Sequence, residues 1–135
     1  MKGILLFGHG ARNPAWALPF ERIRQIILAT DATALIETGF LELMRPSFAE
    51  GIDKLINQGA TEIVVVPIFV AGGGHVNKDL PLQAAKAMTR HAGLMIHLAP
   101  PVGEAESVLA AMANYALQMA SSGSGQLPLK DGNTV

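Results

Sequence analysis

The segment over residues 64–81 constrains the fold more than any other, because it joins a buried-type strand to a glycine-rich break. It reads V-V-V-P-I-F-V-A-G-G-G-H-V-N-K-D-L-P. A continuous run of β-branched residues is typical of a strand buried on both faces. Three glycines follow the run, and His75 comes directly after them. A buried strand that delivers one histidine to a glycine-rich loop is a common way to build a site in an α/β protein.

The N-terminus has the same layout, since the short apolar run over residues 2–7 ends in Gly8-His9-Gly10-Ala11-Arg12. Across the chain, four predicted strands alternate with four predicted helices. The strands are expected at residues 3–7, 33–41, 61–70 and 94–98, and the helices are expected to begin at Pro14, Pro46, Lys78 and Gly103. Asn13 before Pro14 is a typical N-cap, and Gly59 is a typical helix terminator.

Apolar residues at helical spacing indicate which face of each predicted helix is buried. The first helix has Trp16, Phe20, Ile23 and Ile27; the third has Leu82, Ala85 and Met88; the last has Val108, Met112, Tyr115 and Met119.

The alternation of strands and helices predicts a three-layer α/β fold with a four-stranded parallel sheet, covered by helices on both faces. The expected strand order is 2-1-3-4. In that order the chain switches direction between the first and third strands, and ligands bind at the carboxyl ends of the strands beside such a switch point. His9 follows the first strand and His75 follows the third. The topology therefore predicts that the two histidines share one rim of the sheet.

Composition limits the class of protein. A chain of 135 residues suits one domain, expected over residues 1–121, whereas residues 122–135 are polar and glycine-rich and are expected to form a flexible tail. The net charge of −1 gives no support for nucleic-acid or membrane binding through charge. There is no signal-peptide layout and no apolar run near the roughly 20 residues that span a bilayer. We expect a soluble, cytoplasmic protein.

The absence of cysteine excludes thiolate metal sites and cysteine nucleophiles. Two imidazoles suit a borderline divalent ion such as cobalt, nickel, iron or zinc. Two ligands are too few for a permanent structural site, so an open, weakly held metal would suit a protein that passes the metal on. The other two histidines are expected to be structural, because His91 lies in the last turn of a helix and His97 ends the fourth strand.

Further polar residues lie near the predicted rim. Glu42 follows the second strand. Its carboxylate is suited to binding metal or taking protons, and the alternative interpretation is a solvated loop acid. Three cations are suited to holding an acidic substrate, or are exposed loop charges: Arg12, Arg45 and Lys78. The backbone N–H groups of Gly73 and Gly74 can approach a ligand closely, although no Gly-Lys-Ser/Thr follows as in a P-loop.

Three segments together resemble the class II tetrapyrrole chelatases, and within that group the short, single-domain sirohydrochlorin cobaltochelatases (CbiX-type). They are Leu6-Phe7-Gly8-His9-Gly10-Ala11-Arg12; residues 38–46 with Gly39-Phe40-Leu41-Glu42; and residues 67–81 with Gly74-His75 and Asp79-Leu80-Pro81. The resemblance covers residues 1–120. The family usually has a small hydroxyl residue where this chain has Ala11, so the departure affects a hydroxyl contact there and leaves the histidines unchanged.

The resemblance implies a homodimer of short subunits, each equivalent to one half of a longer two-domain chelatase. It also implies ATP-independent insertion of a divalent metal ion into sirohydrochlorin, in a cobalamin- or sirohaem-type pathway. The metal is a substrate, with Co²⁺ the first expectation and Ni²⁺ or Fe²⁺ the alternatives, and no nucleotide is needed. Carried over by position, His9 and His75 would bind the metal and accept protons, with Glu42 assisting. The macrocycle's carboxylates need donors, and the local supply is Arg12, Arg45, Lys78 and the amides of Gly73 and Gly74.

Other functions are compatible with the same residues. A metal or tetrapyrrole carrier that binds without turnover cannot be separated from a chelatase by sequence. The Gly8-His9-Gly10 motif is similar to the Arg-His-Gly of phosphohistidine phosphatases, but those enzymes need an arginine where this chain has Gly8. An α/β interaction module with accidental histidines is the third alternative.

Overall fold

The computed structural model describes residues 1–71 and 73–122, without the side chain of His75. The strands are β1 (Lys2–Gly8), β2 (Leu35–Phe40), β3 (Glu62–Pro67) and β4 (Met95–Leu98). The helices are α1 (Leu18–Thr30), α2 (Phe48–Asn57), α3 (Gly74–Arg90) and α4 (Glu106–Ser122), with the short 3₁₀ helices η1 (Pro14–Ala17) and η2 (Val102–Glu104). The tail predicted over 122–135 lies outside the described residues, except for Ser122, which ends α4. None of the helices described in 1–71 and 73–122 is long and apolar enough to cross a membrane.

The four strands form one parallel sheet in the predicted order, β2-β1-β3-β4. Phe7, near the end of β1, is in register with Gly39 of β2 and Pro67 of β3. The carboxyl ends of the three strands therefore lie at the same level. This register confirms that the segments following β1 and β3 begin side by side, as the strand order predicted.

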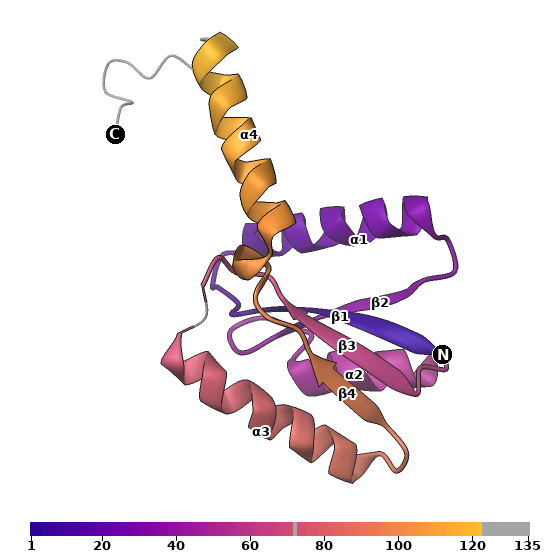
Figure 1. The fold of residues 1–135 in the computed structure, drawn as a ribbon. Helices are drawn as coiled ribbons and strands as arrows, with labels where there is room; N and C mark the ends of the chain where they lie inside the picture. The colour runs from indigo at the N-terminus through magenta and orange to yellow at the C-terminus, as the bar shows by residue number, and fades with distance from the viewer. Residues whose placement is uncertain (72, 123–135) are drawn as a thin grey trace.

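Helices α2 and α3 cover one face of the sheet, and α1 lies on the other (Figure 1). Between α2, α3 and the sheet lies the main core, whose largest fully buried members are Leu5, Phe7, Phe48, Ile52, Leu55, Ile63 and Val65. Each such side chain contributes about 1.5–3 kcal/mol through burial. The core therefore holds β1 and β3 firmly where they deliver the loops that follow them.

At Pro14, where the first helix was predicted to begin, the chain forms the 3₁₀ helix η1, and α1 itself begins at Leu18, whereas α2 begins at Phe48, close to the predicted Pro46. The Asn13 side chain accepts a hydrogen bond from the Ala15 N–H at 2.9 Å, as expected of an N-cap. The α2 helix begins shortly after Pro46 with a reciprocal capping box between Ser47 and Glu50. Gly59 has φ +105, the left-handed conformation expected just after a helix.

The face predicted for the third helix is wrong. The helix begins at Gly74 rather than Lys78, and its buried positions follow that start: Val76, Leu80, Ala84 and Ala87. Leu82 is therefore 61% exposed and Ala85 is exposed, while Met88 is partly buried against the core. The earlier start also places His75 in the first turn of a helix rather than in a loop.

The last helix, α4, projects from the rest of the fold (Figure 1), and none of its residues is buried. Tyr115, from the stripe predicted for this helix, is 63% exposed. Against the sheet, α1 packs over β2, where Phe20 meets Phe40 with ring centroids 5.1 Å apart. On β4 the side chains of Met95 and His97 are exposed. Of the stripe predicted for α4, Val108 is partly buried, whereas Met112, Tyr115 and Met119 are not covered by the described residues.

Candidate active site at the ends of β1 and β3

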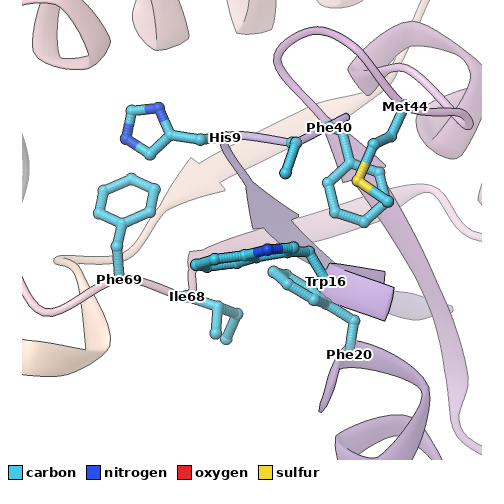
Figure 2. A pocket seen from close by; sticks show the side chains of 9 residues that line it. His9, Trp16, Phe20, Phe40, Met44, Ile68 and Phe69 are labelled. Atoms are coloured by element: carbon cyan, nitrogen blue, oxygen red, sulfur yellow. The ribbon is translucent and has the colours of Figure 1, made fainter. Parts of the chain in front are cut away.

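The carboxyl end of β1 opens into a pocket of about 250 Å³ (Figure 2). Its lining consists of His9, Gly10, Ala11, Trp16, Phe20, Phe40, Met44, Ile68 and Phe69. Figure 2 shows His9 and Phe69 together on one side and Phe40 and Met44 on the other. Among the described residues of this otherwise apolar lining, which exclude the side chain of His75, His9 is the only titratable group. The pocket therefore joins one metal-binding and proton-accepting group to a wall suited to an unsaturated carbon skeleton.

Backbone hydrogen bonds fix His9 against the loop after β2. The Leu41 N–H donates to the Gly8 carbonyl at 2.9 Å, and the Glu42 N–H donates to the His9 carbonyl at 3.1 Å. The pairing between β1 and β2 thus continues past the strand ends. Glu42 lies beside His9 along the rim, as predicted, with its side chain exposed.

Gly10 makes this close approach possible. It has φ +92, and a Cβ there would lie 1.9 Å from the Glu42 carbonyl oxygen. Any side chain would be strained by the backbone conformation and blocked by the neighbouring loop. The loop carrying His9 therefore depends on glycine at position 10.

A chain of aromatic contacts connects His9 to the core. Phe7 meets Phe48 edge-on at 5.9 Å between ring centroids and meets Phe69 at 6.4 Å. Phe69 in turn lies 4.9 Å from the imidazole of His9. The position of the imidazole is therefore supported by packing. Within residues 1–71 and 73–122, no group hydrogen-bonds to its nitrogens, so both are free to bind a ligand.

His75 is the second residue of α3, which follows the segment after β3. The meeting of its imidazole with that of His9 stays a prediction. Among the described side chains, which exclude that of His75, no three histidine or carboxylate groups gather into a metal-binding cluster. Gly73 is the N-cap of α3, and a Cβ at Gly73 or Gly74 would meet nothing within 4 Å. Packing therefore requires glycine at neither position.

The predicted cations lie in different surroundings. Arg45 is ion-paired with Glu50, with Nε 3.2 Å from Oε1 and a second contact through Nη2. Glu50 also accepts the Ser47 N–H at 2.9 Å, and these bonds, that of Arg45 first, lower the pKa of Glu50 to about 2. The structure thus places Arg45 at the start of α2 and not in the His9 pocket. Arg12 and Lys78 are exposed, and neither forms an ion pair with another described residue.

Sequence reasoning missed the apolar wall of the pocket. Trp16 was expected on the buried stripe of a helix, but it lies in η1 and is 66% exposed at the pocket. Its wall partners Met44 and Ile68 come from the segments after β2 and β3. Pro14 gave no signal of this, because proline is equally typical of the first position of an α-helix, whereas the chain forms a separate 3₁₀ turn there before α1 begins at Leu18.

Comparison with known proteins agrees with the fold and with the motifs. The family model CbiX matches residues 3–118. A sirohydrochlorin cobaltochelatase from Sulfurisphaera tokodaii is 33% identical over 108 residues, covering 80% of this chain and 85% of that protein. The protein of the same name from Priestia megaterium is 34% identical over 109 residues, covering 81% of this chain. This chain spans only 35% of the Priestia megaterium protein and 57% of the Methanopyrus kandleri one.

Solved structures give the same result. The CbiX protein from Marinobacter aquaeolei VT8 superposes with a TM-score of 0.79 at 25% identity, covering 90% of this chain and 99% of that one. The sirohydrochlorin chelatase SirB from Bacillus subtilis subspecies spizizenii, in complex with cobalt, superposes with a TM-score of 0.73 at 29% identity, covering 88% of this chain and 51% of that one. The family model and these relatives match most of the chain, and the chain therefore belongs to the CbiX family.

Proposed function

We propose that this chain inserts a divalent metal ion into sirohydrochlorin without ATP, using His9 to present the ion and to accept protons. The observation that carries the proposal is the position of His9. Its imidazole is exposed at the end of β1, held by Phe69, with both nitrogens free of described partners, at the edge of an apolar pocket. Relatives named sirohydrochlorin cobaltochelatase and the SirB complex with cobalt support the same reading.

Metal insertion requires a group that binds the ion and a group that accepts protons, and an imidazole can do both. A divalent ion must lose water, and the two N–H protons of the macrocycle must leave as the ion binds the four pyrrole nitrogens. Two protons are released for each doubly charged ion inserted, so charge balances. Imidazole both binds borderline divalent ions and exchanges protons near neutral pH. His75 is proposed as the second such group and Glu42 as an assisting carboxylate, because Glu42 is joined to His9 through the backbone at 3.1 Å.

The carboxylates of the macrocycle need donors outside the apolar pocket. We assign this role to Arg12 and Lys78, and to the amides of Gly73 and Gly74, around which there is open space. Arg45 would have to exchange its Glu50 partner for a substrate carboxylate. Co²⁺ is the metal we propose first, with Ni²⁺ and Fe²⁺ as alternatives, and the cytoplasmic location belongs to the same proposal.

Anaerobic absorbance spectroscopy of sirohydrochlorin with Co²⁺, Ni²⁺ or Fe²⁺ tests this function. We expect the protein to accelerate the appearance of the metallated spectrum over the rate in buffer alone, with one ion inserted fastest. A shifted spectrum of the bound macrocycle without acceleration by any ion would contradict a chelatase and favour the carrier. No spectral change and no acceleration would contradict both.

The same proposal includes a homodimer in which α4 packs against a second copy. This helix has 17 residues, of which only Glu106 is charged, and none is buried. A helix this apolar is normally covered by other protein. On β4, Met95 is 54% exposed. The longer SirB chain, of which this chain covers 51%, has room for a second half of similar size, and a second copy would supply that half here.

Sedimentation equilibrium tests the dimer. We expect twice the chain mass of 14.2 kDa for the wild type and the monomer mass for Tyr115→Glu, because a carboxylate would be buried without a partner in the interface. Leu82→Glu is the matched control, since Leu82 is 61% exposed on α3 and Tyr115 is 63% exposed on α4. A monomeric wild type, or a dimer that survives Tyr115→Glu, would contradict the proposal.

A further inference from the structure

We propose that Trp16 is the residue on which the macrocycle of sirohydrochlorin rests while His9 presents the metal. This inference rests on the proposed function and names a substrate-contacting group that the motifs do not include. The size of the pocket limits how the macrocycle can bind. Its volume of about 250 Å³ is below the roughly 300–1,000 Å³ of pockets that enclose a drug-sized ligand. A tetrapyrrole therefore does not enter whole, and it lies across the mouth with one edge inside.

Trp16 stands at that mouth. Figure 2 shows the indole seen edge-on in the middle of the lining, with His9 and Phe69 on one side and Phe20 on the other. Trp16 is 66% exposed, so much of its surface is available to a ligand. Flat conjugated rings stack on aromatic side chains, and indole is the largest such surface in proteins.

The backbone at Trp16 is held in place before any ligand binds. The Trp16 N–H donates to the Asn13 carbonyl at 3.1 Å, and the Ala15 N–H donates to the Asn13 side chain at 2.9 Å. An exposed indole on a fixed turn loses little freedom when a ligand covers it, which favours binding.

The position of His9 makes this contact useful for insertion. Its imidazole and the Phe69 ring are 4.9 Å apart, and both line the same pocket as Trp16. A flat ligand resting on the indole therefore has His9 near one face. Among the described lining residues none besides His9 is titratable, and Arg12 and Lys78 are exposed outside the pocket, so we expect the macrocycle's carboxylates to point outward.

The test measures kcat and KM for insertion, together with the Kd of metal-free sirohydrochlorin from its absorbance shift. For Trp16→Ala we expect KM and Kd to rise about tenfold, because stacking and buried apolar area are lost, with kcat nearly unchanged. Trp16→Phe should restore most of the affinity. Leu18→Ala is the matched control, since Leu18 is 67% exposed two residues further on but does not line the pocket.

The outcomes separate this inference from the proposed function. If the wild type is active and Trp16→Ala keeps its KM and Kd, or loses only kcat, the inference is overturned and the proposed function stands. If the wild type neither binds nor metallates sirohydrochlorin, both are overturned. Urea midpoints for all variants show whether a loss of affinity comes from a loss of folded protein.

Discussion

Alanine in place of His9 is expected to abolish protein-dependent metal insertion while leaving the fold intact. The substitution removes the one titratable group among the described lining residues, and with it the proposed metal ligand and proton acceptor. A positioned acid–base group contributes about 10²- to 10⁴-fold to a rate, so we expect insertion to fall at least about 100-fold. Because the imidazole is exposed, the free energy of unfolding should change by no more than about 0.5 kcal/mol.

The matched control for this variant is His97→Ala. His97 is also an exposed histidine, but it lies on β4 and hydrogen-bonds Glu62 at 2.8 Å, outside the pocket. We expect it to keep the wild-type rate, whereas His75→Ala should lose activity as His9→Ala does if the two imidazoles act as a pair. Full activity in both His9→Ala and His75→Ala would contradict the proposed mechanism. Initial rates from absorbance compare the wild type with His9→Ala, His75→Ala and His97→Ala, and urea midpoints verify that each protein is folded.

The sequence was sufficient to predict the sheet and its rim, because those features depend on strong local signals. The β-branched run before the glycines could only be a buried strand, and alternation with amphipathic helices required parallel pairing. The register of Phe7 with Gly39 and Pro67 confirms the predicted order. The closeness of Glu42 to His9 followed from the same reasoning, since neighbouring parallel strands end at one edge.

Prediction failed where a boundary had no local signal. The α3 helix begins at Gly74, after Gly73, which supplies no side-chain cap. Without a cap residue to mark the start, the helix was placed four residues late, and the wrong face was expected to be buried. By contrast, Ser47 and Glu50 have the spacing of a typical capping box. The sequence therefore indicates that Glu50 lies at the start of α2, next to Arg45.

The apolar pocket could not be read from the sequence for a different reason. Its described lining comes from the end of β2, from the segments that follow β1, β2 and β3, and from η1 and the start of α1. No spacing rule links Trp16 to Met44 or to Phe69, because only the folded sheet brings these segments to one edge. The position of His9 was predictable because it directly follows β1, whereas the apolar wall around it was not.

Alanine in place of Gly10 is expected to destabilise the protein by about 3 kcal/mol and to reduce insertion together with stability. Two effects add. The residue has φ +92, which side chains rarely adopt, and the new Cβ would lie 1.9 Å from the Glu42 carbonyl oxygen. The loop after β2 would have to move away from the loop that carries His9, which breaks the hydrogen bond from the Glu42 N–H to the His9 carbonyl.

Gly93→Ala separates the two effects. Gly93 also has a positive φ, +84, but a Cβ there would meet nothing within 4 Å. Backbone strain alone should therefore lower the free energy of unfolding by about 1 kcal/mol in that variant, as measured by urea unfolding, and leave insertion unchanged. A larger loss for Gly10→Ala than for Gly93→Ala would show that contact between the two loops, and not glycine's backbone freedom alone, fixes His9. Equal losses with full activity would show that His9 keeps its place when the loops separate.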